Sequence, residues 1–223
     1  MKIEITSDTG DVIRVWGHTL LEGVLDKAPP PLTVMDIGTG LGVVSTVFLS
    51  LEYDVTGISL GEGTSKNLSY DNYTHVKENL FDLDLPPVDI VWSGMMIEHM
   101  PNVNLFLEKC RRLTKPGGWF CIVAPSDETD VLVDGHLTFW TPAHLIYNLV
   151  IAGFDCSEAL WYTEGRDLGL MVQRKDRPQV DLNYDRGDLE ALAPYFPTPL
   201  VHRVTHPWLA DNFEVDNEGS NTS

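Results

Sequence analysis

The stretch Val34-Met35-Asp36-Ile37-Gly38-Thr39-Gly40-Leu41-Gly42 decides the fold of this chain, because it joins an apolar run to an acidic residue and three alternate glycines. Glycine adopts positive φ at little cost, and its missing Cβ lets a ligand approach the backbone closely. Residues 43–51 follow with the pattern of a helix, whose N-terminus would face that ligand. The stretch therefore predicts a β-strand that runs into a nucleotide-binding turn.

The spacing of these glycines argues against a dinucleotide site. The usual dinucleotide motif is Gly-x-Gly-x-x-Gly. Here Val43 occupies the place of the third glycine of that motif, and Asp36 lies just before the first. A hydride-transfer site is therefore the weaker interpretation.

Strand and helix signals alternate along the rest of the chain. We expect strands at 33–37, 54–58, 73–77, 88–92 and 119–124, and helices at 42–51, 61–70, 102–113 and 142–151. Two final strands, near 154–161 and 168–174, are expected to pair as a hairpin on the sheet edge. Such alternation is typical of a parallel sheet with crossover helices.

These signals predict one main domain, residues 32–175, between two extensions. Residues 1–31 form an N-terminal helical lead-in, which ends at Pro29-Pro30-Pro31 and which we expect to cap the mouth of the site. Residues 176–223 form a C-terminal arm rich in Pro, Asp and Asn. Its last eight residues have nothing apolar to bury, so we expect a disordered acidic tail there.

Composition limits the kind of partner. The chain has 223 residues, of which 43% are hydrophobic, enough for one well-buried domain. Its 33 acidic and 15 basic residues give a formal net charge of −18, which would repel nucleic acid. We therefore expect a small-molecule partner and no nucleic-acid partner. Solubility explains the charge equally well, and the oligomeric state is left open.

The sequence does not predict a membrane or secreted protein. No apolar stretch approaches the roughly 20 residues that span a bilayer, and the first residues lack the apolar core of a signal peptide. We expect a cytoplasmic protein without a membrane partner. Cys110, Cys121 and Cys156 are scattered and odd in number, which predicts reduced, partly buried thiols rather than disulfides or a zinc cluster.

Three segments resemble, in order and at fitting distances, the motifs of class I S-adenosylmethionine-dependent methyltransferases. Residues 36–42 are similar to motif I of that family, residues 88–100 to motif IV with its following loop, and Leu113-Thr114-Lys115-Pro116-Gly117-Gly118 to a Leu-Lys-Pro-Gly-Gly turn. Together they cover residues 33–124. The resemblance implies a Rossmann-like α/β fold: a seven-stranded, mostly parallel sheet with a reversed edge strand and helices on both faces. It also implies S-adenosyl-L-methionine as the cofactor.

The resemblance implies which residues hold this cofactor, and they follow the ends of four strands. They are Asp36, Gly38, Thr39, Gly40 and Gly42 in motif I, Ser59 and Leu60 after the second strand, Asn79 and Leu80 after the third, and Ser93 after the fourth.

The second strand departs from the family pattern, in which an acid at this place takes both ribose hydroxyls. Ser59 follows the strand here, and a serine cannot accept from two hydroxyls as a carboxylate does. Either Glu62 replaces the acid or cofactor affinity is reduced. Capping of the expected helix at 61–70 is an equally good interpretation of Ser59.

Asn79 suits the reading of the adenine amino group better than Asp82. An amide can pair with both the exocyclic amine and a ring nitrogen, whereas a carboxylate only accepts. A plain turn residue is the alternative interpretation of Asn79.

Two histidines, His136 and His99, are the candidates for catalysis. His136 lies in residues 135–142, Gly-His-Leu-Thr-Phe-Trp-Thr-Pro, which resemble the approach to the next helix in many small-molecule methyltransferases. A histidine can take a proton from a hydroxyl or amine at neutral pH, and His136 is the better candidate for this general base. For either histidine, a purely structural hydrogen bond that orients a loop is an equally good interpretation.

The Glu98-His99 pair is similar to part of a Glu-x-x-Glu-His motif that holds a divalent metal in some ubiquinone-biosynthesis and small-RNA methyltransferases. Here Met95 stands at the first glutamate. Loss of a carboxylate removes both a ligand and a charge from a site for a hard cation. Together with His136 the pair would form a depleted site at best, so we expect no metal.

The wall of the acceptor site is expected in residues 125–135, which carry Asp127, Glu128, Asp130 and Asp134. A cationic acceptor would suit these acids, although solvated loop acids are more common. Trp16, His18 and Trp140 are candidates for lining an apolar pocket, with core packing as the alternative for at least one tryptophan.

We therefore expect an enzyme that transfers a methyl group to an oxygen or nitrogen of a small molecule, nearest in style to ubiquinone-biosynthesis-like O-methyltransferases. Two alternatives remain. An aminopropyltransferase shares the fold, but the acid expected after its fourth strand is replaced here by Ser93-Gly94. A non-catalytic binding protein of the same fold is suggested by the changes at Ser59 and Met95.

Overall fold

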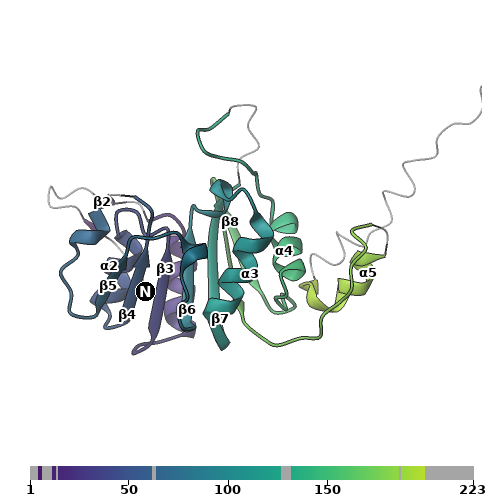
Figure 1. Cartoon of the computed structure of the whole chain (residues 1–223), viewed down its shortest axis with the longest axis horizontal. Helices are drawn as coiled ribbons and strands as arrows, with labels where there is room; N and C mark the ends of the chain where they lie inside the picture. The colour runs from purple at the N-terminus through teal and green to yellow at the C-terminus, as the bar shows by residue number, and fades with distance from the viewer. Residues whose placement is uncertain are drawn as a thin grey trace, which may run out of the picture.

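Seven strands form one sheet in the order β5-β4-β3-β6-β7-β9-β8 (Figure 1). This computed structural model describes residues 15–61, 64–126, 132–185 and 187–198, and the backbone of a separate pair of short strands, β1 (Ile5–Thr6) and β2 (Val12–Ile13). The strands of the large sheet are β3 (Thr33–Ile37), β4 (Asp54–Ile58), β5 (Tyr73–Val76), β6 (Val88–Gly94), β7 (Thr114–Pro125), β8 (Leu160–Glu164) and β9 (Asp167–Gln173).

The sheet is parallel except for β9, which runs antiparallel to both β7 and β8. The expected mostly parallel sheet and the final hairpin are therefore confirmed. The reversed strand is not at the edge itself, because the hairpin places its second strand, β9, against β7. Its first strand, β8, is left at the edge.

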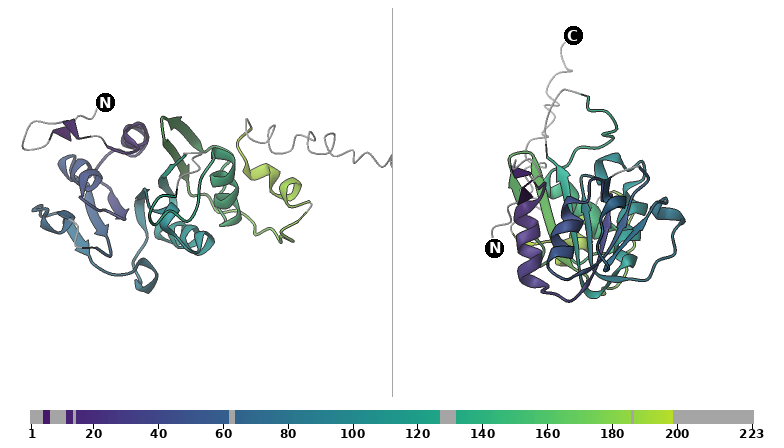
Figure 2. Two further views of the ribbon diagram at one scale, coloured as in Figure 1. Left: turned by 90° about the horizontal axis from the view of Figure 1, so that it is seen from above. Right: turned by 90° about the vertical axis from the view of Figure 1, so that its left-hand side faces the viewer.

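Helices cover both faces of this sheet (Figures 1 and 2). One face packs against α1 (His18–Lys27) and α2 (Val43–Ser50). The other face packs against α3 (Val103–Leu113) and α4 (Pro142–Ile151). Each face has its own hydrophobic core: the first core lies between the sheet and α1 and α2, and the second core lies between the sheet and α3 and α4. Side chains alternate along β3, so that Val34 belongs to the first core, whereas Met35 and Ile37 belong to the second.

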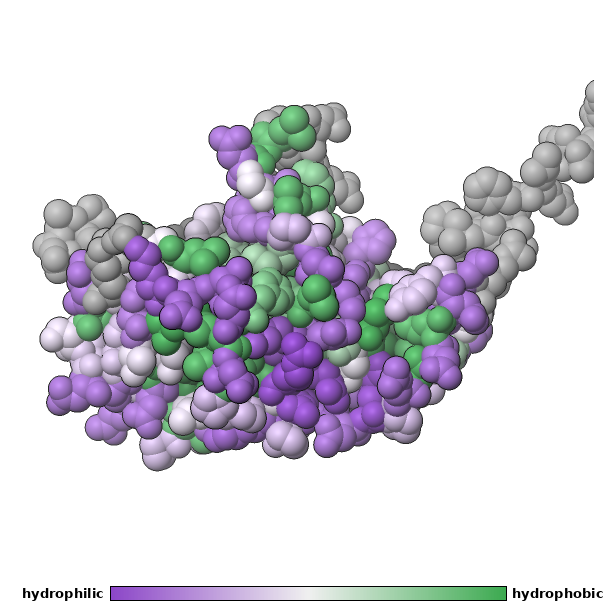
Figure 3. All heavy atoms as spheres, viewed as in Figure 1, coloured by the Kyte–Doolittle hydropathy of each residue, from purple (hydrophilic) through white to green (hydrophobic). Residues whose placement is uncertain are grey.

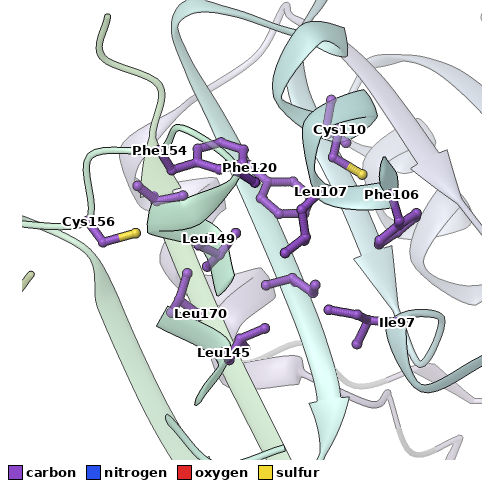
Figure 4. Packing of buried hydrophobic residues seen from close by; sticks show 14 of the residues in the cluster. Ile97, Phe106, Leu107, Cys110, Phe120, Leu145, Leu149, Phe154, Cys156 and Leu170 are labelled. Atoms are coloured by element: carbon purple, nitrogen blue, oxygen red, sulfur yellow. The ribbon is translucent and has the colours of Figure 1, made fainter. Parts of the chain in front are cut away.

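The second core has buried side chains of α3 and α4 at its centre (Figure 4). Phe106, Leu107 and Cys110 of α3 are fully buried there. The rings of Phe120 and Phe154 stack with their centroids 5.2 Å apart. Helix α4 begins at the predicted residue and α3 begins one residue after it. Asn102 and Thr141 cap the two helices by accepting hydrogen bonds from backbone N–H groups of the first turns.

Two predicted elements differ in the structure. The α-helix expected over 61–70 is wrong: residues 64–67 form only a short 3₁₀ turn, η1 (Thr64–Asn67), and 68–70 are irregular. The segment contains two glycines, two serines and one asparagine, which have poor helix propensity. The strand expected from 154 begins only at Leu160, since Asp155 instead closes a turn by accepting from the Ser157 N–H.

The first part of the C-terminal arm packs on the main domain. It contains α5 (Asp188–Leu192) and η4 (Ala193–Tyr195), and Leu192 and Phe196 are buried in the second core. The guanidinium of Arg177 donates to the Val150 and Phe154 carbonyls at the end of α4 and lies 4.2 Å from the centre of the Tyr195 ring. The expected tail, from residue 199 onward, lies outside the described residues.

The cysteine prediction is confirmed. Cys110, Cys121 and Cys156 are buried free thiols, and burial raises the pKa of each. Within the described part of the chain, no helix combines the length and apolar character needed to cross a bilayer.

Asp89 ties together the amino ends of three neighbouring strands, β3, β6 and β7. Its carboxylate accepts from the Thr33 hydroxyl at 2.6 Å and N–H at 3.0 Å, and from Lys115 Nζ at 2.9 Å. Burial opposes ionisation, but the hydrogen bonds from Thr33 and Lys115 outweigh it, so that the pKa of Asp89 is lowered. A lowered pKa in the folded state stabilises the fold at neutral pH.

We predict that Asp89→Asn lowers the free energy of unfolding by about 1–2 kcal/mol at pH 7. The carboxylate contributes this stability above its unfolded pKa, near 4, and the contribution is lost as pH falls through the lower pKa of the folded state. The wild type and the variant should therefore converge as pH falls below about 4. Urea unfolding across pH 7 to 3 measures this, with the exposed Asp71→Asn as control. A pH-independent difference would contradict the prediction.

Candidate functional site

The turn between β3 and α2 has the backbone that its three glycines predict. Gly38, Gly40 and Gly42 have φ values of 81°, 50° and 77°. Residues other than glycine rarely adopt such φ values, so the backbone conformation of the turn by itself requires glycine at these positions. The turn is anchored to the neighbouring strand, because the Gly38 N–H donates to the Ile58 carbonyl at 2.9 Å.

The three glycines differ in what surrounds them. A Cβ on Gly38 would lie 2.2 Å from Met96 Cγ, and one on Gly42 would lie 2.9 Å from Leu68 Cδ1. A Cβ on Gly40 would face open space, with only the Gly38 carbonyl oxygen within 4 Å, at 3.7 Å. Gly38 and Gly42 thus serve packing within the protein, whereas Gly40 leaves room for a ligand.

Beneath the turn, Asp36 is a buried carboxylate held by hydroxyl groups. It is 3% exposed and accepts from Ser45 Oγ at 2.6 Å, and Ser45 Oγ lies 3.0 Å from Thr39 Oγ1. Burial raises the pKa of Asp36, and the hydrogen bonds from Ser45 and Thr39 oppose that rise. The cluster connects the end of β3, the turn and the first turn of α2.

A cavity of about 270 Å³, here called the first cavity, lies on one side of the turn. Its walls come from the turn and from the ends of β3, β4 and β5, with two methionines from the segment after β6. The lining residues are Ile37, Gly38, Gly40, Ile58, Ser59, Leu60, Gly61, Glu78, Asn79, Leu80, Met96 and Met100. Open α/β sheets bind ligands at this place, outside the carboxyl ends of the strands.

The structure brings most of the predicted cofactor residues to this first cavity. Ser59, Leu60, Asn79 and Leu80 all line it. Asn79 also caps the short turn η2 (Leu80–Asp82), because its Oδ1 accepts from the Phe81 N–H at 3.1 Å. The turn interpretation and the ligand interpretation of Asn79 are therefore compatible. Glu62 lies outside the described residues.

A second cavity, of about 240 Å³, lies on the other side of Gly38. Apolar side chains predominate in it, and the lead-in contributes Val15 and Trp16. The lining residues are Val15, Trp16, Asp36, Gly38, Thr39, Leu41, Val43, Val44, Trp92, Gly94 and Met95. The rest of the described lead-in does not cover a mouth, because α1 packs on β7 and β9.

Three of the predicted site residues, Ser93, Trp140 and Gly42, line neither cavity. Ser93 is fully buried within β6 and lines neither cavity, so its side chain is not available to a ligand there. Trp140 is 5% exposed and belongs to the second core, whereas Trp16 is 45% exposed and lines the second cavity. Gly42 also lines neither cavity; it is the N-cap residue of α2.

His99 and His136 come together although they are far apart in the sequence. Their ring centroids are 5.0 Å apart at an interplanar angle of 86°. His99 belongs to η3 (Ile97–His99), between the two methionines that line the first cavity. Its Nδ1 lies 2.9 Å from the Gly135 carbonyl oxygen, which holds the segment of His136 against η3.

Glu98 lies behind this pair. Its side chain is 1% exposed, and its Oε1 lies 3.9 Å from His99 Nε2. Burial raises the pKa of Glu98, opposed by His99. The Glu98, His99 and His136 ligand atoms lie within 4.8 Å of one another, a spacing that could hold a cation. Met95, which stands where the metal-binding motif has its first glutamate, packs against the first core and lines the second cavity. The expected absence of a metal stays a prediction.

The segment that carries His136 projects beyond the sheet between β7 and α4 (Figure 1). Its apolar side chains are unusually exposed: Leu132 is 95% exposed, Leu137 59% and Phe139 48%. Figure 3 shows such apolar groups among polar ones on this projection. Of the predicted acidic wall, Asp134 is exposed there, and Asp127, Glu128 and Asp130 lie outside the described residues.

Sequence reasoning missed several residues of the two cavities. Met96 and Met100 line the first cavity, and Trp92 and Met95 line the second. All four lie in residues 88–100, which were recognised as a motif. Nothing in that motif indicates that successive methionines face different cavities.

Comparison with known proteins agrees with this geometry. Residues 35–122 match a family described as "Methyltransferase domain". The chain is 36% identical over 96 residues to the ubiquinone biosynthesis O-methyltransferase of Maricaulis maris, covering 39% of this chain and 38% of that protein. It is 32% identical over 127 residues to the 2-methyl-6-phytyl-1,4-hydroquinone methyltransferase of Synechocystis sp., covering 53% and 39%.

A solved structure has the same fold at low identity. The 1,6-didemethyltoxoflavin-N1-methyltransferase of Burkholderia thailandensis, solved with 1,6-didemethyltoxoflavin and S-adenosylhomocysteine, superposes with a TM-score of 0.61 at 18% identity. The superposition covers 71% of this chain and 77% of that one. The matched part of this chain spans about two fifths of the length of the curated relatives named above.

The sheet order, the glycine turn and the two cavities define a class I methyltransferase fold. Residues 35–122 of this fold are similar to the family described as a methyltransferase domain and to S-adenosylmethionine-dependent relatives. The predicted fold and the predicted family resemblance are thus confirmed.

We predict that Ser45→Ala destabilises the protein by about 2–3 kcal/mol, because it removes a hydrogen bond to a buried carboxylate. Ser50→Ala, on the exposed end of the same helix, should change stability by less than about 0.5 kcal/mol. Thermal and urea unfolding of both variants at pH 7 provide the measurement. Equal effects of the two substitutions would show that Ser45 does not support the turn.

Proposed function

We propose that the protein binds S-adenosylmethionine and transfers its methyl group to an oxygen or nitrogen of a small, largely apolar acceptor. The observation that supports this proposal most directly is the position of Gly40. A Cβ on this residue would face open space in a cavity at the carboxyl ends of the parallel strands, within the part of the chain that matches the family. The names of the relatives support a methyl donor of this kind and acceptors with an aromatic or quinol ring.

The residues of the first cavity fit the adenosine part of such a cofactor. Leu60 and Leu80 offer apolar surface for a base, Asn79 offers amide groups at its edge, and Ser59 lies near the turn where a ribose would follow. The Gly38–Gly40 backbone would allow close approach of the rest of the molecule. When bound, the cofactor supplies a methyl group on a sulfonium that carries its own leaving group.

The second cavity suits the acceptor. Trp16, Leu41 and Met95 give it an apolar wall, and an aromatic ring gains from contacts with such side chains. Most of the rate would come from positioning the acceptor and excluding water. His136, with His99 beside it, would take the proton that the acceptor loses, which is a secondary contribution.

We predict that the wild type binds S-adenosylhomocysteine in isothermal titration and does not bind NAD. Gly40→Ala should weaken this binding about tenfold or more, since the added methyl group fills ligand space at a cost of about 1–3 kcal/mol. Binding followed by production of S-adenosylhomocysteine from S-adenosylmethionine across a panel of hydroquinones, catechols and N-heterocycles would establish turnover.

Gly117→Ala is the matched control. Gly117 has φ of 79° and nothing within 4 Å of an added Cβ, so this variant carries similar backbone strain away from both cavities. It should bind S-adenosylhomocysteine as the wild type does. Equal losses in the two variants would contradict the ligand role of Gly40, and binding of NAD alone would contradict the proposed function.

We predict that His136→Gln lowers kcat about 10- to 100-fold for an acceptor hydroxyl that must lose its proton. The loss should be much smaller for a strongly acidic phenol, which is already ionised, and the Kd of S-adenosylhomocysteine should not change. His99→Gln should have the smaller effect of the two. Initial rates with paired acceptors, with and without a chelator, measure this.

His144→Gln, on the exposed side of α4, is the control for histidine loss. The assignment of His136 as the general base is refuted if His136→Gln slows methyl transfer to both acceptors equally, or if it also weakens cofactor binding. A rate that disappears with the chelator would instead assign Glu98, His99 and His136 to a cation.

A further inference from the structure

Ser59, at the end of β4, is paired with a histidine of the neighbouring strand. Its Oγ lies 3.1 Å from Nε2 of His75. The register of β4 and β5 places His75 opposite Gly57, and the Ser59 N–H donates to the Val76 carbonyl at 3.1 Å. Both side chains are half-buried. The backbone and the hydroxyl of Ser59 are therefore both held by β5.

The position of Ser59 makes this pair significant. In Rossmann-like folds the ribose of the ligand lies at the end of the second strand, about 20 residues after the glycine turn, where a carboxylate ordinarily takes its hydroxyls. Ser59 stands at that place and lines the first cavity with Gly38 and Gly40. A neutral hydroxyl therefore stands where that carboxylate ordinarily lies.

A lone serine is a poor replacement, because its hydroxyl rotates and donates as readily as it accepts. A neighbouring imidazole nitrogen that accepts the hydroxyl proton removes this ambiguity. The lone pairs of the serine oxygen are then directed away from the proton and are left to accept. Toward the ligand, the serine oxygen then acts only as an acceptor, as a carboxylate oxygen does.

We propose that His75 is the positioning residue for the cofactor ribose: its Nε2 accepts the Ser59 proton, so that Ser59 Oγ accepts a hydrogen bond from a ribose hydroxyl. The inference rests on the proposed use of S-adenosylmethionine. It requires the His75 tautomer that carries its proton on Nδ1. It assigns a binding role to a strand residue that does not itself line the cavity.

The test compares S-adenosylhomocysteine with its 2′,3′-dideoxy analogue by isothermal titration. The wild type should bind the dideoxy analogue about tenfold more weakly, as expected for lost hydrogen bonds of about 1.4 kcal/mol. His75→Phe should weaken the binding of S-adenosylhomocysteine several-fold and leave the binding of the dideoxy analogue unchanged, so that the ratio of the two Kd values shrinks. Ser59→Asp in the His75→Phe background should restore the ratio, because a carboxylate needs no partner to accept.

Thr74→Val is the matched control, since Thr74 is the exposed neighbour of His75 on the same strand. A second measurement needs no ligand: ¹H–¹⁵N spectra of the free protein should show His75 protonated on Nδ1, with a change in Ser59→Ala. The Nε2-protonated tautomer would overturn the inference. The inference would also be overturned if Glu78→Gln abolished the difference between the two Kd values while His75→Phe kept it. That result would assign recognition of the ribose to the Glu78 carboxylate.

The two proposals fail in different ways. If the wild type does not bind S-adenosylhomocysteine, the proposed function and this inference are both wrong. If it binds S-adenosylhomocysteine and His75→Phe keeps the full ratio, only the role of His75 is wrong.

Discussion

The passage of the chain from β3 into α2 is the constraint on which the rest of the site depends. Three residues there have positive φ, and a carboxylate is buried beneath them. Such a carboxylate is costly unless it is hydrogen-bonded, and Ser45 meets that need from the first turn of α2. The strand, the turn and the helix are thereby one unit. The neighbouring strand leaves room for this unit at Gly57, where a Cβ would lie 3.2 Å from Thr39 Cγ2 of the turn and 2.4 Å from the Tyr73 hydroxyl of β5.

The two cavities follow from this turn and from the end of β6. Gly38 lies between them and lines both. Across from it, Met95 lines the second cavity and Met96 the first, and Met95 has a φ of 51°. A non-glycine residue with positive φ marks local strain, which the surrounding structure must hold in place. That conformation directs two successive side chains to different cavities, so a single irregular residue separates the proposed cofactor space from the proposed acceptor space.

Sequence pattern predicts what depends on near neighbours along the chain. The helix α3 and the glycine turn are of this kind. The helix expected over 61–70 does not form, because the glycines in this segment have low helix propensity. Contacts across strands could not be predicted, since the register that brings His75 to Ser59 is set by the whole sheet. For the same reason Trp16 and Trp140 could not be distinguished before packing buried one of them.

The histidine pair links the proposed chemistry to the shape of one projecting segment. His136 reaches His99 only because residues 135–137 are tied to η3, by the Gly135 carbonyl at His99 Nδ1 and by the Leu137 N–H, which donates to the Glu98 carbonyl at 2.7 Å. The segment has exposed leucine and phenylalanine side chains but few other polar ties to the domain among those described. Its position therefore depends mainly on these two hydrogen bonds.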